Sequence, residues 1–355
     1  RYSGRMPGVR RRRTKYFAWE RLPDHELLDQ RLCDLGVDLE GTWLEEPIEA
    51  VSAELAWRDL RVKPRFWLSE EWFSPDGIVG VALPFFLAHP RLMRLERRQM
   101  LEVEGGTHAK CLRLLRHEIG HTVQHAFQLQ RRRRFATLFG KSSRAYPDYY
   151  RPNPASQKYV LHLDYWYAQA HPDEDFAETF AVWLTPGSRW RKRYASWPVA
   201  LRKLEFVDEL MGELAGRAPS VKRRGRVEPL SSIKHTLREH YASKRERFSG
   251  LTSAVHDDDL NRLFEEEGAS RRRSESAASF LRRNRARIRH MVGESTGKHE
   301  YALDVVLGEM VHRCRELRLR AVGGERQLLV ELAILVAARS VEYVYRYRGR
   351  DWHAM

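Results

Sequence analysis

The stretch LLRHEIGHTVQHAF, residues 114–127, contains the side chains of this sequence that are best suited to chemistry. His117 and His121 are four residues apart, so on a helix both project from one face, about one turn apart. A zinc ion can join two imidazole nitrogens placed in this way, and Glu118 lies close enough to contact a metal-bound water without ligating the metal. In this His-Glu-x-x-His arrangement the glutamate is the general base of a metallopeptidase. The spacing therefore predicts His117 and His121 as zinc ligands and Glu118 as the catalytic base.

The same five-residue pattern also occurs on the polar faces of ordinary amphipathic helices, so its surroundings have to be considered. After Gly105–Gly106, Thr107 can cap a long helix that runs through this stretch, and an apolar stripe runs beside the histidines at helical spacing. It consists of Leu112, Leu115, Ile119, Val123 and Phe127. Histidines beside a buried stripe do not simply face bulk water. This favours a metal site over an amphipathic helix with histidines on its solvent-exposed face.

His125 extends the row of histidines but is not expected to bind the same ion. It lies two turns from His117, a distance of ~12 Å at ~1.5 Å rise per residue. The longer metzincin pattern would place glycine at position 124 and histidine at position 127, where this chain has Gln124 and Phe127. That class is excluded, and the third ligand must come from another part of the chain.

Glu174, on a second predicted helix, is the candidate for the third ligand. His171–Pro172 can open this helix and Pro186–Gly187 can end it. One face is apolar, and the adjacent face has small alanines that let two helices approach closely. The apolar face has Phe176, Phe180 and Trp183, and the adjacent face has Glu174, Ala177, Glu178 and Ala181. Acids in the first turn also complement the positive helix N-terminus, but that explanation does not extend to Glu178 one turn later.

The segments HEIGH and EDFAETF together resemble the gluzincins, zinc peptidases whose third ligand is a glutamate on a downstream helix. The longer segment YAQAHPDEDFAETF is similar to the active-site segment of the anthrax lethal factor family. That resemblance implies Glu174 as the zinc ligand, Glu178 as a carboxylate that supports a histidine ligand, and Tyr167 as the tyrosine that stabilises the oxyanion. Tyr165 is the rival of Tyr167, because a slip of one residue exchanges the faces of an extended segment.

The chain also resembles a bacterial family of zinc-binding metallopeptidases, most specifically over residues 60–215. Relatives of that kind can carry an N-terminal zinc ribbon, which this sequence lacks because its cysteines are unpaired in sequence. The resemblance implies one Zn²⁺ per chain and the hydrolysis of peptide or isopeptide bonds by a metal-activated water. Three protein ligands leave the open position that a catalytic zinc needs. The stretch 144–169, before the second helix, is rich in tyrosine. Three of its tyrosines are expected to pack or to line the substrate site: Tyr149, Tyr150 and Tyr159.

The order of predicted elements indicates an α+β fold with a zincin-like metallopeptidase domain. We expect a basic arm and helices in residues 1–59, the catalytic domain in 60–215, a linker in 216–230 and a helical C-terminal domain in 231–355. The runs PRFWLS (64–69) and GIVGVALPFF (77–86), separated by SPDG, predict a small antiparallel sheet. Pro84 suits an edge strand, so residues 78–86 are expected to line the cleft and to pair with substrate backbone.

A strongly basic composition restricts the partners of the protein. Lysine and arginine total 63 against 48 acidic residues, which gives a formal net charge of +15 and attracts polyanions. The three cysteines, Cys33, Cys111 and Cys314, are far apart and favour a reducing compartment. The basic N-terminus precedes no apolar segment of a secretory signal, and the most apolar stretch, 328–338, is too short to span a bilayer. These features predict a cytoplasmic protein without a membrane segment.

Basic segments follow both metal-bearing helices and suggest a substrate preference. Arg189, Arg191 and Arg193 follow the second helix, and the run RRRR at 131–134 follows the first. Arginine can hold a carboxylate bidentately, so the hypothesis is a preference for acidic peptides or for a free C-terminal carboxylate. The alternative is an ordinary solvated surface that keeps a basic protein in solution.

Two other functions compete with a zinc peptidase. A nucleic-acid-binding protein could use the runs at 131–134, 222–226 and 282–289 for phosphates, but no recognised motif or aromatic interleaving accompanies them. An inactive zincin fold used as a scaffold is the other alternative, and the presence of Glu118 argues against it. The sequence indicates neither the physiological substrate nor the oligomeric state.

Overall fold

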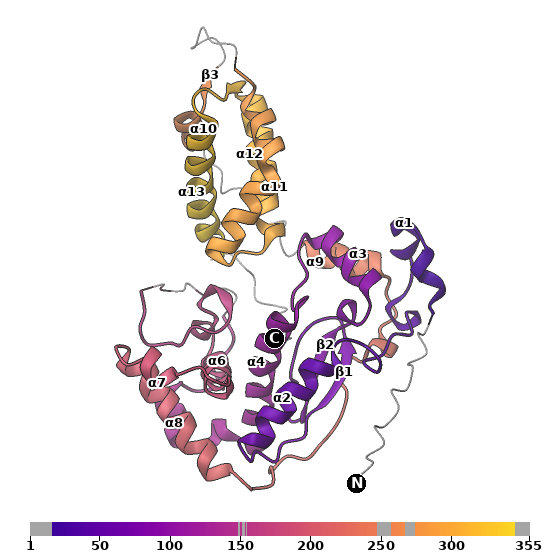
Figure 1. Cartoon of the computed structure of the whole chain (residues 1–355), viewed down its shortest axis with the longest axis vertical. Coiled ribbons are helices and arrows are strands. Elements are labelled where there is room, and N and C mark those ends of the chain that lie inside the picture. Colours follow the sequence, from indigo (N-terminus) through magenta and orange to yellow (C-terminus); the bar gives the residue numbers. More distant parts are fainter. Residues whose placement is uncertain are drawn as a thin grey trace, which may run out of the picture.

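The computed structural model describes residues 16–147, 150, 153, 155–246, 257–266 and 274–344. The basic arm expected at the N-terminus and Tyr149 lie outside these residues. The chain is mostly helical, and Figure 1 shows a larger body formed by the residues up to 246, with a separate helical bundle formed by residues 257–344 above it. The larger body contains every residue predicted to take part in metal binding.

The elements of the larger body fall into three consecutive parts of the chain. The N-terminal part contains η1 (Ala18–Arg21), α1 (Asp24–Leu27), η2 (Leu32–Asp34), α2 (Glu45–Trp57), β1 (Arg65–Ser69), β2 (Gly80–Pro84), η3 (Phe85–Ala88) and α3 (Pro90–Met100). The middle part contains α4 (His108–Phe127), η4 (Leu129–Arg131), α5 (Arg133–Leu138), η5 (Asp164–Gln169), α6 (Pro172–Leu184), α7 (Trp190–Arg193) and α8 (Pro198–Leu214). The last part contains η6 (Leu230–Ser232) and α9 (Leu237–Glu246).

The sheet at β1 and β2 is parallel, so the prediction of a small antiparallel sheet is wrong. Arg65 lies opposite Gly80 and Ser69 lies opposite Pro84 in the parallel register. The turn signal at SPDG does produce a reversal, but the segment that pairs with β2 across that turn is Phe73, which forms an antiparallel bridge with Ala82. The chain therefore reverses twice between the two strands, and β1 comes to lie parallel to β2.

The strand β2 is central and buried, which also removes the prediction that it pairs with substrate. All five of its residues are buried. β1 occupies one side, and on the other side Ala82 exchanges hydrogen bonds with Phe73 while Val79, just before the strand, donates to the carbonyl of Arg223. A strand with both edges occupied has no free backbone groups to offer a peptide.

The helix α4 lies at the centre of the larger body, with α6 on one side of it and α2 and β2 on the other (Figure 1). Thr107 caps α4, and Gln128 ends it in the left-handed conformation; His171 caps α6, which begins at Pro172. Both starting points were predicted from the sequence and are confirmed. Each helix buries the apolar stripe expected of it, except that Leu112 of α4 is half-buried, because the residues recur every three or four positions.

Two ion pairs hold these central helices in position from either side. Arg116 of α4 forms a bidentate pair with Glu54 of α2, at 2.9 and 2.6 Å. Asp175 of α6 accepts from the buried ammonium of Lys203 on α8 at 2.6 Å. Charged groups in such surroundings are retained only when they are paired, so these contacts fix the two helices relative to their neighbours.

Residues 216–246 run back over the larger body. Val221 donates to the carbonyl of Ala126, and Trp67 donates from its indole to the carbonyl of Val227. Further on, Leu237 donates to the carbonyl of Gln30. The segment 231–246, expected to be part of the C-terminal domain, therefore packs against the N-terminal part of the chain.

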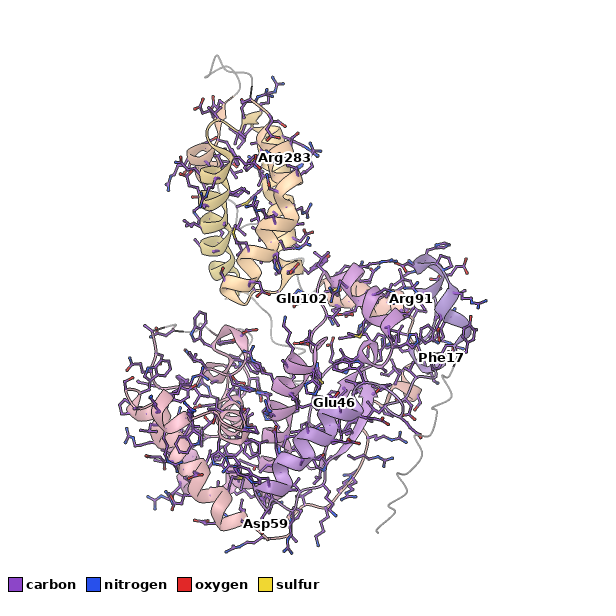
Figure 2. The ribbon with its side chains drawn as sticks, in the orientation of Figure 1. Phe17, Glu46, Asp59, Arg91, Glu102 and Arg283 are labelled. Atoms are coloured by element: carbon purple, nitrogen blue, oxygen red, sulfur yellow. The ribbon has the colours of Figure 1, made fainter. Side chains whose placement is uncertain are left out.

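The bundle consists of long helices around an apolar core. Its elements are α10 (Asp257–Leu263), β3 (Glu265–Glu266), α11 (Ala277–Thr296), α12 (Glu300–Glu316), β4 (Leu319–Arg320) and α13 (Glu325–Val344). Figure 2 shows Glu102 of the larger body directly below it, where this carboxylate lies 3.0 Å from His299 and accepts from the backbone of Glu300. None of the helices in the described ranges is both long and apolar enough to cross a membrane.

Candidate metal centre

The structure brings His117, His121 and Glu174 into one tight cluster. The Nε2 atoms of the two histidines are 3.1 Å apart, and each is 3.1 Å from Oε2 of Glu174. The cluster is closed to solvent, since His117 and Glu174 are 0% exposed and His121 is 4% exposed. Residues 53 positions apart in the sequence thus direct three potential ligand atoms at one point.

The donor set and its geometry fit a zinc ion. Two imidazole nitrogens and one carboxylate oxygen form a common ligand set for catalytic zinc, and in a tetrahedral site with bonds of ~2.0–2.1 Å the ligand atoms lie ~3.3 Å apart. The observed separations of 3.1 Å are close to this spacing. The three residues leave a fourth position free for water or substrate, as catalysis requires.

The electrostatics of the metal-free cluster also favour a cation. Burial opposes a charge on His117, but hydrogen bonds to the carboxylates of Glu174 and Glu178 outweigh it and raise the pKa of the imidazole to about 10. Burial likewise opposes ionisation of Glu174, while both histidines hold the pKa of this carboxyl far below its usual range. The pocket therefore attracts positive charge, which either protons or a metal ion can supply.

The buried carboxylate of Glu118 lies next to this cluster. It is 0% exposed, and neither of its carboxylate oxygens has a hydrogen-bond partner among the described residues. Burial raises the pKa of the carboxyl to about 7. A buried acceptor without a donor is costly, so a water molecule is the natural partner at this position. A carboxyl with a pKa near neutrality is also well matched to the role of general base.

Glu178 contacts the back of one histidine. Its Oε1 atom is 2.8 Å from Nδ1 of His117, and its Oε2 atom accepts from the backbone of Leu163 at 2.7 Å. Such a carboxylate fixes the ring orientation of a metal-binding histidine and increases its basicity. The role that the family resemblance implies for Glu178 agrees with this position.

Tyr146 supports Glu174 and was missed by the sequence reasoning. Its hydroxyl donates to Oε1 of Glu174 at 2.7 Å, and its ring stacks on His171 with centroids 3.8 Å apart. His171 accepts from the backbone of Asp173 through Nδ1, so Nε2 carries the proton that it donates to the carbonyl of Arg144. The loop before α6 is thereby pinned to the start of the helix. The tyrosine-rich segment was the only sequence signal for this contact.

Tyr167 lies beside the cluster from η5. It is 3% exposed, and its ring centroid is 5.6 Å from that of His117. Burial, together with the charge of Glu174, raises the pKa of its hydroxyl well above the usual value, so the group is a neutral donor. Tyr150 lies behind it with ring centroids 6.4 Å apart, whereas Tyr159 packs under the ammonium of Lys203. The side chain of Tyr165 is outside the described part of the structure.

A close approach of α4 and α6 makes the cluster possible. A Cβ atom placed on Gly120 would lie 2.8 Å from the Cα atom of Ala177 and 3.0 Å from its carbonyl oxygen. Backbone at this distance leaves no room for any side chain at position 120. The small residues of the two helices thus allow Glu174 to reach the histidines on α4, as the alanines of α6 suggested.

The other residues singled out from the sequence have contacts elsewhere. His125 is not part of the cluster, and its Nδ1 atom is 2.9 Å from a carboxylate oxygen of Asp76. The guanidinium of Arg191 pairs with Asp208 at 2.5 Å. Arg193 lies over the ring of Tyr194, and Arg189 precedes α7 in the left-handed conformation. No contact in the described ranges joins these three arginines to the metal cluster.

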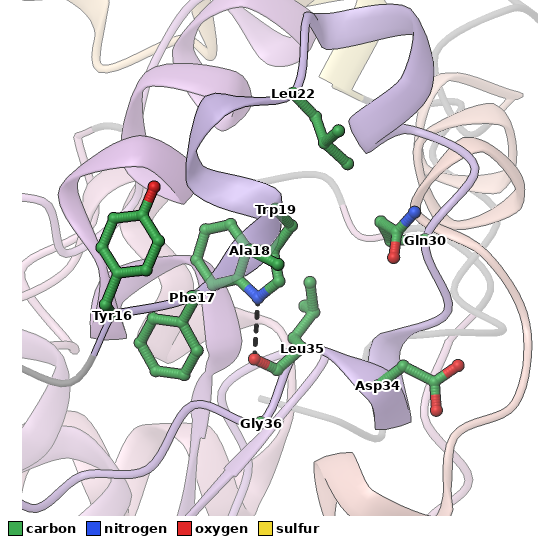
Figure 3. A pocket seen from close by; sticks show the side chains of 9 residues that line it. All are labelled: Tyr16, Phe17, Ala18, Trp19, Leu22, Gln30, Asp34, Leu35 and Gly36. Atoms are coloured by element: carbon green, nitrogen blue, oxygen red, sulfur yellow. Dashed lines mark hydrogen bonds between the residues drawn. The ribbon is translucent and has the colours of Figure 1, made fainter.

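A pocket on the surface lies at the N-terminal end of the described chain (Figure 3). It has a volume of about 360 Å³ and is lined by residues between Tyr16 and Gly36. Trp19 forms part of its wall and donates from its indole to the carbonyl of Leu35 at 2.9 Å. None of the lining residues belongs to the metal cluster, so this pocket is separate from the candidate site.

The comparisons with known proteins agree with a metal site in this part of the chain. Residues 93–187 match a family model described as "putative zinc-binding metallo-peptidase". No curated protein matches the chain, and no solved structure matches it. The matched segment begins in α3 and ends after α6, so it contains the three clustered residues, Glu118 and both tyrosines that adjoin them.

Proposed function

We propose that this protein is a zinc-dependent peptidase that hydrolyses peptide or isopeptide bonds through a metal-activated water. The observation that carries the proposal is Glu118, a fully buried carboxylate without a hydrogen-bond partner among the residues that the structure describes, beside a cluster of two imidazoles and a carboxylate. A site that only bound metal would not need a buried, unpaired acid at that position. The match to a metallopeptidase family model over residues 93–187 supports the same reaction class.

In this proposal each residue of the site has a separate role. His117, His121 and Glu174 hold one zinc ion, which supplies Lewis acidity and lowers the pKa of water to ~7. Glu118 takes a proton from the attacking water and returns it to the leaving amine. Tyr167, kept neutral by burial, donates a hydrogen bond to the oxyanion as it forms. Glu178 orients His117, and Tyr146 orients Glu174.

The domain that carries this chemistry is proposed to be zincin-like and to cover residues 60–215. The order of an upstream strand, the histidine-bearing helix α4 and the glutamate-bearing helix α6 supports this, as does the resemblance of both helical segments to gluzincins. The linker is proposed in residues 216–230 and the helical C-terminal domain within 231–355, where the bundle of residues 257–344 supports it, whereas residues 231–246 pack on the larger body. A cytoplasmic location, supported by three unpaired cysteines, belongs to the same proposal.

A preference for acidic substrates is the weakest part of the proposal. Arg191 already pairs with Asp208, and Arg132 and Arg134 pair with Glu213 and Glu209. These arginines would have to exchange their present partners for a substrate carboxylate, which reduces the gain in binding energy. Arg189 and Arg193 remain candidates for contact with an acidic peptide.

Binding to nucleic acid is less well supported. In the basic run at 282–289, Arg283 pairs with Glu275 and Glu325, whereas Arg285 and Arg289 both pair with Asp304. Charges neutralised within the protein release few counterions when a polyanion approaches, and counterion release drives most non-specific binding to nucleic acid.

The decisive experiment is digestion of a diverse peptide library, read by mass spectrometry, with Glu118→Gln as the test variant. The amide keeps the size of the side chain and removes the base, so we expect turnover to fall by ~10²–10⁴-fold while bound zinc is retained. Glu205→Gln, an exposed acid on α8, is the matched control and should leave turnover unchanged. Full activity in Glu118→Gln, or in protein stripped of metal by a chelator, would refute the proposal.

A further inference from the structure

A second group of potential metal ligands lies outside the site described above. Glu70, in the connection after β1, lies close to His235, just before α9, and to His240, within α9. Oε1 of Glu70 is 2.7 Å from Nε2 of His235 and 2.8 Å from Nδ1 of His240. The three ligand atoms lie within 4.8 Å of one another. Their chemistry is the same as that of the first cluster: two imidazole nitrogens and one carboxylate oxygen.

The two histidines are held in position by the local structure of α9. Thr236 and Glu239 form a reciprocal capping box at 2.7 and 3.2 Å, which fixes where the helix begins. The carbonyl of His235 accepts from the backbone of Leu32. The ring of His240 packs edge-to-face against Phe85 and Tyr241, with centroids 5.3 and 5.0 Å away. These contacts hold Nε2 of His235 and Nδ1 of His240 towards Glu70.

The accessibility of this group suits an ion that exchanges with solvent. The His240 side chain is only 3% exposed, whereas the His235 side chain is 39% exposed and that of Glu70 is 28% exposed. One side of the group is thus rigid and buried, and the other side is open to water. A cation could enter from this open side and keep water in a remaining coordination position.

We infer that Glu70, His235 and His240 form a second divalent-metal site, separate from the cluster on α4 and α6. Imidazole and carboxylate ligands together select borderline transition-metal ions, of which Zn²⁺ is the probe to use. The site is structural: its ligands come from segments 165 and 170 residues apart, so a bound ion would fasten α9 to the loop after β1. No unpaired acid adjoins it among the described residues, in contrast to Glu118 at the first cluster.

Hydrogen bonds from both imidazoles to Glu70 are the competing explanation of the same contacts. Glu70→Gln separates the two explanations, because an amide oxygen still accepts from both rings but is a poor ligand for zinc. A variant that keeps its thermal stability and loses one zinc ion indicates a metal site. A variant that keeps all its metal indicates a hydrogen-bond network only.

The test is the zinc content of the full-length protein, measured by elemental analysis after equilibration with Zn²⁺ and removal of the excess. We expect two ions per chain in the wild type, one in Glu70→Gln, one in Glu174→Ala and none in the double variant. His235→Ala should match Glu70→Gln. His290→Ala is the control, because His290 is exposed and lies 3.5 Å from Glu300 without a second histidine partner in the described structure.

The outcomes distinguish failure of this inference from failure of the proposed peptidase. One ion in the wild type that is lost in Glu174→Ala and retained in both Glu70→Gln and His235→Ala would overturn the second site and leave the first intact. Two ions with no peptidase activity would support the second site and contradict only the proposed reaction.

Discussion

The two clusters of this protein contain the same ligand types in different surroundings. The cluster on α4 and α6 is closed to solvent, and its ligands sit on two helices whose backbones touch at Gly120 and Ala177. The cluster at Glu70 takes its ligands from a loop, from the residue before a helix cap and from a helix, and it is open on one side. Within the described ranges, only the first has further polar side chains in contact with its potential ligands, namely Glu178 and Tyr146.

This difference matches the two roles that we propose, a reaction at the first cluster and the attachment of α9 at the second. Ligand chemistry alone is the same in both, so it does not explain why only one cluster should be catalytic. The first cluster adds Glu118, a buried carboxylate whose oxygens have no hydrogen-bond partner in the described part of the chain, and a neutral tyrosine hydroxyl at Tyr167. A carboxylate that is to take a proton from water cannot have both oxygens occupied by protein donors, and the contacts around it compensate for that cost.

Loss of a ligand should have the largest effect. In a Glu70→Gln background, which leaves one site to measure, Glu174→Ala should weaken zinc binding by more than ~100-fold, above the range for supporting residues. Competition with a chromophoric chelator measures the dissociation constant. Glu205→Gln in the same background is the control. Unchanged affinity in Glu174→Ala would mean that the third ligand is another residue.

Loss of the carboxylate behind His117 should come next. Glu178→Ala should weaken zinc binding by ~10–100-fold, because the ring of His117 loses the contact that orients it. The same titration measures the effect. If Glu178→Ala cost more affinity than Glu174→Ala, the roles of the two glutamates would have to be exchanged. No equivalent variant exists at the second cluster, where no supporting carboxylate was found among the described residues.

Widening the contact between α4 and α6 should lower stability. Gly120→Ala places a methyl group 2.8 Å from the backbone of Ala177, and overpacking of this kind lowers the free energy of unfolding by ~1–3 kcal/mol. Denaturant unfolding of the metal-free protein measures it. Gly212→Ala on α8 is the matched control, because a Cβ atom there meets nothing within 4 Å and alanine favours the helix. Equal effects of the two substitutions would contradict the close approach.

Removal of the Tyr146 hydroxyl should have the smallest effect, a slight loss of zinc affinity. Tyr146→Phe deletes the hydrogen bond to Glu174 and should weaken zinc binding by ~5-fold, which corresponds to ~1 kcal/mol for one hydrogen bond. Tyr16→Phe, at an exposed tyrosine far from both clusters in sequence, is the control. A loss as large as that of Glu174→Ala would show that Tyr146 determines the cluster geometry rather than adjusting it.

The parts of this molecule that local patterns describe were predicted well from the sequence. Thr107 and Pro172 mark the beginnings of α4 and α6 because caps and proline act within one turn. The pair His117 and His121 follows from helical geometry. The position of Glu174 was inferred from the small residues beside it, and the structure brings it to the histidines.

The parts that depend on distant segments were not predicted. The direction of β1 relative to β2 depends on Phe73. This residue, and not β1, pairs antiparallel with β2 across the turn at SPDG. Tyr146 reaches Glu174 from an irregular loop without periodicity. Glu70 and His240 are 170 residues apart, so no spacing rule could associate them. The sequence did not show that arginines of the basic runs are paired with acids, because the acids lie on other helices. Arg134, for example, pairs with Glu209 of α8.

The burial of the first cluster should limit how fast zinc leaves it and how fast a peptide is hydrolysed there. Because the side chains of His117, Glu118 and Glu174 have no exposed surface, an ion can enter or leave only when part of the surrounding protein moves aside. Extraction of zinc by a chelator should then reach a plateau rate at high chelator concentration, set by the opening step. Turnover of a peptide cannot exceed the same opening rate. At the half-open cluster of Glu70, extraction should instead continue to accelerate as more chelator is added.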